Sequence, residues 1–294
     1  MDFVKVKGII TPTSKNDEYF ARSYNMNIYR GCSHGCIYCD SRSDCYHLED
    51  FDIIRGKENA IEIIENELKN KRKTGIIGTG SMSDPYNPFE KIYELTRKSL
   101  KMMDKYRFGV TITTKSSLVT RDIDVFQDIM THSPVNVIIT ITTTDDDLSK
   151  LIEPNVNISS ERFDAVKKLS EAGILAGVYL NPVIPFITDG DKNLVEMVER
   201  AAACGAKYIL NYMGMTLRQG NREYFYKNLD INFKGIKEKY IRTYGLDYML
   251  PIPEIDRKWR LFDNECKKYN LVNRMSEINK LILNSGSCEQ IGLT

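Results

Sequence analysis

The sequence predicts an α/β protein, a partial six-fold (β/α)6 barrel of the TIM type followed by a C-terminal helical extension. The chain has 294 residues, 42% of them hydrophobic and 28% charged, a mixture typical of globular proteins. Short β-rich runs alternate with helical patterns up to about residue 230, and only helical patterns follow. Alternating units with right-handed crossovers favour a parallel sheet that closes partly or fully. A doubly wound open sheet fits the same pattern.

The six candidate strands are near-continuous apolar or β-branched runs, as expected of strands covered on both faces. They span Met26–Tyr29, Gly75–Thr79, Gly109–Thr114, Val135–Thr142, Ile174–Leu180 and Tyr208–Met213. Apolar residues at helical spacing lie between these runs and predict the helices of the barrel. These helices span Asn59–Arg72, Phe89–Tyr106, Asp122–Met130, Ser160–Ala172 and Asn193–Cys204.

The chain is expected to have three parts. Residues 1–24 form an irregular lead-in, residues 25–230 form the barrel, and residues 231–294 form a helical extension packed on it. The extension is punctuated by prolines, and its helices are expected over Ile231–Tyr244, Asp256–Tyr269 and Val272–Leu283.

Charge and hydropathy exclude several classes of protein. The 41 Lys and Arg residues nearly balance the 40 Asp and Glu residues, which excludes a cationic field over the whole surface. Nucleic acid could therefore bind only at a local patch. No run of about 18 apolar residues predicts a membrane span, and the N-terminus lacks a signal-peptide pattern. We expect a cytoplasmic protein without a membrane partner.

Three of the seven cysteines form a tight cluster at the end of the first predicted strand. Cys32, Cys36 and Cys39 give the spacing C-x3-C-x2-C within NIYRGCSHGCIYC. In a reducing compartment such a cluster points to a metal or cofactor rather than to disulfides. Gly31 and Gly35 allow the loop to wrap its thiolates around one centre.

The chemistry of the ligands leaves two kinds of centre open. Thiolates are soft ligands that suit an iron–sulfur cluster or zinc. Structural zinc takes four ligands, and here the fourth would be Cys45, His34 or His47. A cubane iron–sulfur cluster held by three thiolates would instead keep one iron open for a substrate or cofactor.

The cysteine motif, with Tyr38 before its last cysteine, resembles the radical S-adenosylmethionine (SAM) superfamily. Further blocks are similar to its spore photoproduct lyase-like, or "DNA repair photolyase", branch. In order over about residues 24–190 they are SMSDPYNPFE, TITTKSSLVTRDID, IEPN followed by SSERFDAVKKLSEAGI, and NPVIPFITD. The resemblance implies a 4Fe-4S cluster on Cys32, Cys36 and Cys39 with SAM on its open iron. An electron donor of the flavodoxin or ferredoxin type would then allow reductive cleavage of SAM to a 5′-deoxyadenosyl radical.

The resemblance also suggests which residues hold the methionine end of SAM. Family members often have a Gly-Gly-Glu-like stretch after the second strand, where this chain has Gly80 followed by SMSD. Asp84, Ser81 or Ser83 could replace the glutamate, although a plain turn fits as well. Lys115 ends the third strand at the mouth of the barrel and would pair with the methionine carboxylate, unless it is a solvated surface lysine.

Other residues would hold the rest of the cofactor. Thr140 and Thr142 share one face of the fourth strand and could bind the ribose or carboxylate, although threonine is also a common strand former. Arg162 could clamp a carboxylate. Asn181 begins an apolar ledge suited to adenine, and Tyr38 could offer backbone groups to the same base.

Substrate contacts are expected after the sixth strand, where arginines alternate with aromatic residues. Tyr212, Arg218 and Arg222 would suit phosphate contacts and base stacking, or equally a small molecule that carries a carboxylate. A helix N-terminus with solvent-facing arginines fits the same stretch. Cys45, close after the motif, is a candidate hydrogen donor, with a free thiol as the alternative. The resemblance suggests a nucleic-acid base or DNA lesion as substrate, in a lyase or repair reaction. Radical modification of a nucleotide, peptide or metabolite stays open, as does a non-catalytic iron–sulfur module.

Overall fold

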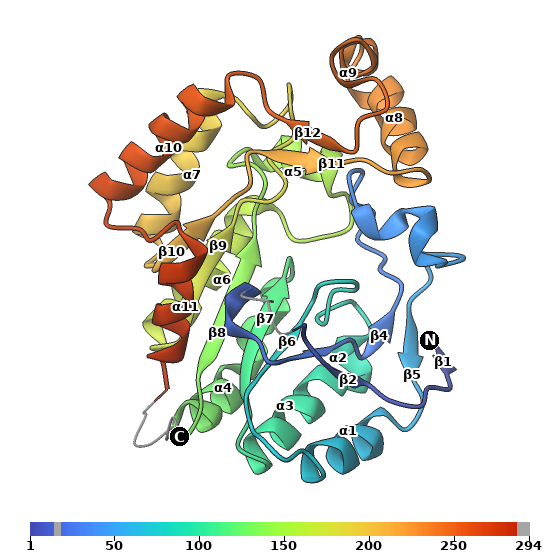
Figure 1. Cartoon of the computed structure of the whole chain (residues 1–294), viewed down its shortest axis with the longest axis vertical. Coiled ribbons are helices and arrows are strands. Elements are labelled where there is room, and N and C mark those ends of the chain that lie inside the picture. Colours follow the sequence, from blue (N-terminus) through green and yellow to red (C-terminus); the bar gives the residue numbers. More distant parts are fainter. Residues whose placement is uncertain (15–18, 287–294) are drawn as a thin grey trace.

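The computed structural model describes residues 1–14 and 19–286, and a seven-stranded sheet is its centre (Figure 1). Six adjacent strands run parallel, and one antiparallel strand is added at the edge. Across the sheet the strands are β10 (Tyr208–Leu210), β9 (Leu175–Tyr179), β8 (Val135–Thr140), β7 (Gly109–Thr114), β6 (Ile76–Thr79), β3 (Tyr24–Met26) and the antiparallel β2 (Ile10–Pro12). The two edge strands, β10 and β2, do not pair. The predicted six-strand partial barrel is therefore confirmed.

Helices cover one face of this sheet, because alternate strand residues are apolar and point toward them. Val110 and Ile112 of β7 pack in the core beneath the helices, whereas Thr111 and Thr113 line a cavity on the other face. The covering helices are α1 (Ala60–Lys69), α3 (Leu95–Lys105), α4 (Ile123–Met130), α6 (Ser159–Glu171) and α7 (Asp191–Ala203). The short helices α2 (Glu90–Tyr93) and α5 (Asp146–Ile152) lie in the connections.

The helix predicted over Phe89–Tyr106 is divided in two. Glu94 takes a left-handed conformation with φ 50° between α2 and α3. The buried carboxylate of Glu90 accepts hydrogen bonds from the backbone amides of Thr96 (3.0 Å) and Arg97 (3.2 Å) at the start of α3. The apolar periodicity predicts a single helix here. The Glu90 side chain instead caps the start of α3, so a second helix begins.

The N-terminal part is more ordered than the sequence predicts. Residues 1–24, expected to be irregular, contain β2, β1 (Asp2–Val4) and a 3-10 turn at Tyr19–Ala21. The strand predicted over Met26–Tyr29 is wrong, because β3 ends at Met26 and β4 (Tyr29–Arg30) belongs to another sheet. That small sheet has the order β1-β5-β4, with β5 at Arg55–Lys57.

The C-terminal part packs on the barrel through two of its helices. α10 (Ile255–Lys268) lies along α7, and α11 (Met275–Leu283) packs against the turn at Tyr19–Ala21 (Figure 1). A buried ion pair joins Lys258 of α10 to Asp189, with 2.8 Å between Nζ and Oδ2. The remaining elements are α8 (Asn221–Asn232), α9 (Ile236–Tyr244) and the antiparallel pair β11 (Gly214–Thr216) and β12 (Met249–Pro251).

The C-terminal helix bounds differ from the predicted ones. The helix expected over Ile231–Tyr244 begins only at Ile236, and α8 runs across the boundary expected after residue 230. Within residues 1–14 and 19–286, no helix is long and apolar enough to cross a membrane.

Candidate functional site

A cavity of about 650 Å³ lies on the inner face of the sheet. Its volume falls in the range of small-molecule sites, roughly 300–1,000 Å³. Strand residues two apart supply the wall, because alternate side chains of a strand point to the same face. From successive strands and the segments just after them, these residues are Gly78, Gly80, Thr111, Thr113, Lys115, Thr140, Tyr179, Asn181 and Tyr212.

Segments from outside the sheet complete the cavity. The cysteine motif contributes Tyr38 and Cys39, and the pair β11–β12 contributes Met215 and Leu250. The N-terminal part contributes Tyr19, Phe20 and Arg22. The cavity therefore joins the cysteine motif to the interior of the barrel.

A glycine fixes the start of the cysteine loop. Gly31 has φ +80°, and a Cβ there would lie 2.3 Å from the carbonyl oxygen of Ile53 and 2.8 Å from that of Phe51. The next amide, of Cys32, donates to the same Phe51 carbonyl at 2.8 Å. Only glycine allows this close approach, so the first thiol is positioned by the backbone itself.

The Glu-Pro-Asn segment after α5 holds the middle of the same loop. Gly35, with φ +69°, packs against Pro154, whose Cγ lies 3.0 Å from the place of a Cβ. The side-chain amide of Asn155 donates to the Ser33 carbonyl at 2.9 Å, and its backbone amide donates to the His34 carbonyl at 3.1 Å. The block IEPN thus has a physical role in fixing the cysteine loop, which its position in the sequence does not reveal.

The three motif cysteines lie close together and could serve one iron–sulfur cluster. Among residues 1–14 and 19–286, no three His, Cys, Asp or Glu side chains converge closely enough to hold one metal ion. Burial raises the pKa of Cys32 to about 11, and it raises the pKa of Cys36 further. The thiolate of Cys39 adds to both shifts, so the three sulfurs lie in one neighbourhood. A cubane takes one thiolate on each iron, which suits three neighbouring but separate donors.

Lys115 lies beside the motif, at the mouth of the cavity. Its Nζ is 5.8 Å from the centre of the Tyr38 ring. Burial lowers the pKa of Lys115, but the charges of Cys36 and Glu153 outweigh this effect and raise it. Lys115 is therefore a cation in the wall of the cavity, beside the cysteine motif.

Arg162, predicted to clamp a cofactor carboxylate, does not line the cavity. It is fully buried and pairs with Glu153, with 2.5 Å between Nη2 and Oε2. It also donates to the Thr140 carbonyl at 2.9 Å. Glu153 in turn accepts a hydrogen bond from the hydroxyl of Tyr38. The Arg162 guanidinium therefore binds groups of the chain itself, and one of them, Glu153, supports Tyr38 in the cysteine motif.

Asp84 also serves the frame of the site in this structure. Its carboxylate accepts hydrogen bonds from the Thr114 hydroxyl at 2.7 Å and from the backbone amides of Lys115 and Tyr86, both at 2.8 Å. Ser83 donates to the Gly31 carbonyl at 2.5 Å. Neither lines the cavity, whereas Ser81 does.

The predicted threonine pair is separated. Thr140 lines the cavity, but β8 ends there and the chain leaves the sheet. Thr142 is fully buried outside the lining, and its hydroxyl has no hydrogen-bond partner among the described residues. Asn181 lines the cavity together with Pro182, as the adenine prediction requires.

Of the three predicted substrate residues, one lines the cavity and two lie outside it. Tyr212 lines the cavity with 53% of its surface exposed. Arg222 is buried and donates to the carbonyls of Leu217 (2.9 Å) and Asp247 (2.6 Å), so it holds the chain around α8. Arg218 lies outside the cavity, beside a second hollow of about 520 Å³.

Arg218 contacts the predicted hydrogen donor. Its Nη1 donates to the Sγ of the exposed Cys45 at 3.3 Å, and its Nη2 donates to the Tyr248 hydroxyl at 2.5 Å. Its Nε lies 3.5 Å from the carboxylate of Asp40, which itself lines the cavity. Cys45 therefore lies near the rim of the site but not in its wall.

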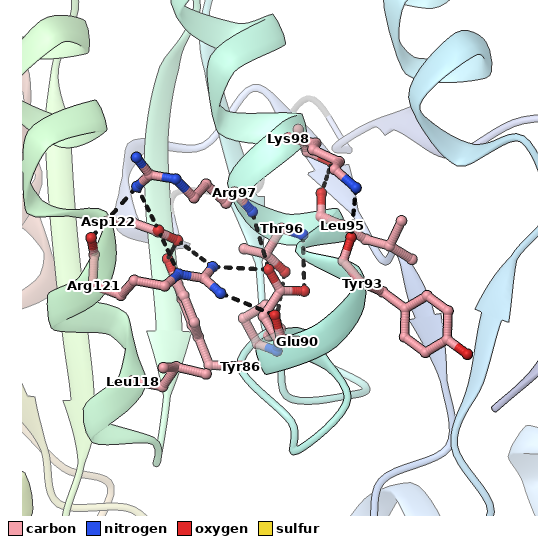
Figure 2. A network of polar contacts seen from close by, with 12 residues as sticks. Tyr86, Glu90, Tyr93, Leu95, Thr96, Arg97, Lys98, Leu118, Arg121 and Asp122 are labelled. Atoms are coloured by element: carbon pink, nitrogen blue, oxygen red, sulfur yellow. Dashed lines mark hydrogen bonds and ion pairs between the residues drawn. The ribbon is translucent and has the colours of Figure 1, made fainter.

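A buried network of charges supports the loops around the site (Figure 2). The carboxylates of Glu90 and Asp122 are fully buried. Arg121 pairs with Glu90 at 2.9 Å, and Arg97 pairs with Asp122 at 2.9 Å. Asp122 also accepts a hydrogen bond from the hydroxyl of Tyr86 at 3.0 Å. Tyr86 lies two residues after Asp84, in the loop after β6. Tyr86 and Glu90 lie in the block SMSDPYNPFE, and Arg121 and Asp122 lie in the block TITTKSSLVTRDID. Sequence reasoning missed the network because nothing in the sequence shows that these two blocks meet.

The fold and site define a class of protein. A model of the radical SAM superfamily matches residues 26–198, which is more than half of the chain. The chain therefore belongs to the radical SAM superfamily of enzymes, as the sequence predicts. Membership implies S-adenosylmethionine and an iron–sulfur cluster as cofactors.

Relatives are known from several organisms. An uncharacterised protein of Methanocaldococcus jannaschii is 38% identical over 190 residues, which cover 63% of this chain and 68% of that protein. An uncharacterised protein of Mycobacterium tuberculosis is 29% identical over 211 residues, covering 69% of this chain and 61% of its own. A protein of Pseudomonas phage M6 named radical SAM Nalpha-GlyT isomerase is 24% identical over 194 residues, covering 65% of this chain and 39% of its own.

Solved structures of spore photoproduct lyase share the fold. One, in complex with dinucleoside spore photoproduct, has a TM-score of 0.68 at 13% identity and covers 92% of this chain and 81% of that chain. A mutant of the same enzyme, with bound AdoMet and dinucleoside spore photoproduct, has a TM-score of 0.63 at 13% identity over the same shares. At this identity the likeness concerns the fold alone.

Proposed function

We propose that this enzyme binds a 4Fe-4S cluster through Cys32, Cys36 and Cys39 and binds SAM in the adjoining cavity. The observation that carries the proposal is the common wall, since Cys39, Tyr38 and Lys115 all line one cavity. When bound, these cofactors supply a 5′-deoxyadenosyl radical that abstracts hydrogen from a substrate.

The residues of the wall would have distinct tasks. Lys115 offers its ammonium to the methionine carboxylate, as a charge-assisted pair inside the mouth of the barrel. Ser81 and Thr140 offer hydroxyls to the cofactor, and Asn181 with Pro182 forms the ledge for adenine. Because these groups come from different strands, the sheet sets their spacing.

Two residues that the sequence assigns to the cofactor would instead act as positioning residues. Asp84 binds the backbone amide of Lys115 and so fixes the place where β7 ends. Arg162 neutralises Glu153, which accepts from the Tyr38 hydroxyl. Both would influence the cofactor through their neighbours rather than by touching it.

For the substrate we propose a nucleic-acid base, in a lyase-type or related radical reaction. The support is the spore photoproduct lyase fold, solved with a dinucleoside spore photoproduct, and the relatedness to the phage isomerase. Tyr212 in the wall offers a ring for stacking. Cys45 remains a candidate hydrogen donor near the rim, and we infer a flavodoxin or ferredoxin as electron source.

The test of the cofactor assignment is SAM binding by Lys115→Gln. A hydrogen bond to a charged group is worth about 1.5–3 kcal/mol, so we expect the variant to bind SAM at least tenfold more weakly. Calorimetry on the reconstituted protein measures the affinity, and iron content with visible absorbance reports the cluster. Lys207→Gln, at an exposed position, is the matched control. Unchanged SAM affinity in Lys115→Gln would refute the assignment.

A further inference from the structure

Helix α9 carries a basic and partly apolar outer side that the cofactor assignment does not use. The stretch KGIKEKYIRTY, residues 234–244, has four Lys or Arg side chains against one carboxylate, in a chain whose charges nearly balance. Two apolar side chains are exposed beside these cations, Ile241 by 51% and Leu246 by 88%. We call the exposed side chains of Lys234, Ile241, Arg242 and Leu246 the α9 face.

Two of the four cations are available to a partner. Lys237 pairs with Asp230 at 2.6 Å, and the Nζ of Lys239 lies 4.0 Å from the centre of an aromatic ring. In the described part of the chain, Lys234 and Arg242 form no ion pair, and both are exposed. The α9 face therefore offers positive charge that no carboxylate of the described chain neutralises by direct contact.

Helix α8, on which α9 packs, is fastened to the cysteine loop (Figure 1). The backbone amide of Asp44 donates to the Gln219 carbonyl at 3.1 Å, just before α8 begins. A Cβ at Gly220 would lie 2.2 Å from the Oδ1 of Asp44, so a glycine permits this close approach. The guanidinium carbon of Arg42 lies 4.0 Å from the centre of the Tyr224 ring on α8. The loop that carries the cysteines thus holds the helix pair in place.

The buried side of α9 leads to the cysteine motif. The hydroxyl of the fully buried Tyr240 donates to the Pro185 carbonyl at 2.8 Å and lies 3.6 Å from the sulfur of Met215. Met215 lines the cavity together with Cys39. Tyr240, Met215 and Cys36 belong to one hydrophobic core. Packed side chains therefore connect α9 with the thiols that would hold the cluster.

We propose that the α9 face docks an acidic protein that carries a one-electron reductant for the cluster. Unpaired cations attract such a partner and speed its encounter, and apolar side chains among them suit the core of a protein interface. A nucleic acid is favoured less, because interfaces with DNA are much more positively charged than this mixed face. In the step proposed, the carrier loses one electron and the cluster gains it, and no atom is transferred.

The proposal rests on the proposed function, because only a redox-active cluster needs this partner. It gives the inferred flavodoxin or ferredoxin a place on the surface. The test compares two reductants on the reconstituted protein with SAM bound. One is a flavodoxin in its hydroquinone form, a small acidic protein, and the other is dithionite, a small ion that needs no docking face. Loss of the visible absorbance of the cluster measures both rates.

The double variant Lys234→Glu with Arg242→Glu should be reduced by flavodoxin at least about tenfold more slowly than the wild-type protein, because it repels an acidic partner. This difference is expected at about 0.01 M ionic strength, where charges act over roughly 30 Å, and it should shrink at about 1 M, where the range is roughly 3 Å. The rate with dithionite should match that of Arg260→Glu, a control at an exposed position on α10.

A second variant tests the apolar part of the α9 face. Ile241→Ser, at a half-exposed position, should raise the half-saturating concentration of flavodoxin about fivefold, because loss of an interface contact costs about 1 kcal/mol. Since apolar contacts are not screened by salt, this effect should persist at about 1 M ionic strength. Ile241→Ser decides the result by itself if the double variant does not fold.

Each outcome decides the proposal. Slower reduction by flavodoxin, with the dithionite rate, SAM affinity and iron content unchanged, supports it. Reduction by flavodoxin that neither variant slows, or a wild-type cluster that dithionite reduces and flavodoxin does not, overturns the docking face and leaves the proposed function standing. Weaker binding of a DNA duplex by the double variant, with flavodoxin reduction unchanged, overturns it in favour of nucleic acid. If dithionite does not reduce the wild-type protein, the proposed function fails instead.

Discussion

Arg162→Met tests whether this arginine supports the site or binds the cofactor. The guanidinium is fully buried and donates to the Asn157 carbonyl (2.7 Å), the Thr140 carbonyl (2.9 Å), the Ser149 hydroxyl (3.0 Å) and Glu153 (2.5 Å). The variant leaves the Glu153 carboxylate buried without its partner. Loss of one member of a buried ion pair costs about 3–5 kcal/mol, and we expect that decrease in the free energy of unfolding.

The assay is urea unfolding of the variant and of Arg260→Met, a surface control expected to change stability by less than about 0.5 kcal/mol. The double variant Arg162→Met with Glu153→Gln should recover part of the loss, because it removes the unpaired charge. A loss below about 1 kcal/mol for Arg162→Met, accompanied by weaker SAM binding, would refute the reasoning. That result would instead favour a cofactor clamp.

The ion pair between Arg162 and Glu153 also predicts how the free energy of unfolding changes with pH. In the wild-type protein burial raises the pKa of Glu153, but Arg162 and Lys115 outweigh it and hold the pKa below its usual value. The ion pair therefore adds stability above the unfolded pKa of about 4.3, and this stability is lost as the pH falls through the lower folded pKa. Without Arg162 we expect burial to raise the pKa of Glu153 in the folded protein. Protonation of Glu153 then removes the penalty of burying an unpaired carboxylate. The stability gap between variant and wild type should narrow from pH 8 to pH 5; a constant gap would contradict this.

Three further predictions concern the frame of the site and its thiols. Asp122→Asn should lower the free energy of unfolding by about 3 kcal/mol in urea, because Arg97 and its neighbours lose a buried carboxylate; a change below about 1 kcal/mol would show that the network in Figure 2 is dispensable. Burial raises the pKa of Cys266 to about 12, so in a Cys288→Ser background iodoacetamide at pH 8 should label the buried Cys266 at least about tenfold more slowly than the exposed Cys45, as peptide mass spectrometry would measure; equal rates would contradict the burial. If Cys45 donates hydrogen, Cys45→Ala should change the product or its rate of formation, and an unchanged chromatographic profile would exclude that role.

The parts of the fold that local patterns determine were predictable. The parallel strands were found because apolar and β-branched runs mark them, and the motif cysteines because their spacing is specific. The split at Glu94 was missed, because it depends on the buried Glu90 capping the next helix. The strand at Met26–Tyr29 was misplaced, because the same apolar run serves two sheets in turn.

The site was predictable only where a residue follows a strand or a motif. Lys115 directly follows β7 and Tyr212 lies two residues after the end of β10, so their place in the cavity wall could be inferred. Arg162 and its partner Glu153 both lie in blocks that resemble the family, but the sequence does not show that the two side chains pair inside the protein. Arg22 gave no signal, because it reaches the cavity only through the packing of a distant segment against the sheet.

Formation of 5′-deoxyadenosine tests the central assignment most directly. The purified chain is reconstituted anaerobically with iron and sulfide, reduced, and given SAM, and the product is measured by liquid chromatography. We expect product from the wild-type protein with about four irons per chain, the load of one cubane, and none from Cys36→Ala. No product from a protein with a full cluster would indicate a module that only holds the cluster, and zinc in place of iron would contradict the assignment of an iron–sulfur cluster to these cysteines.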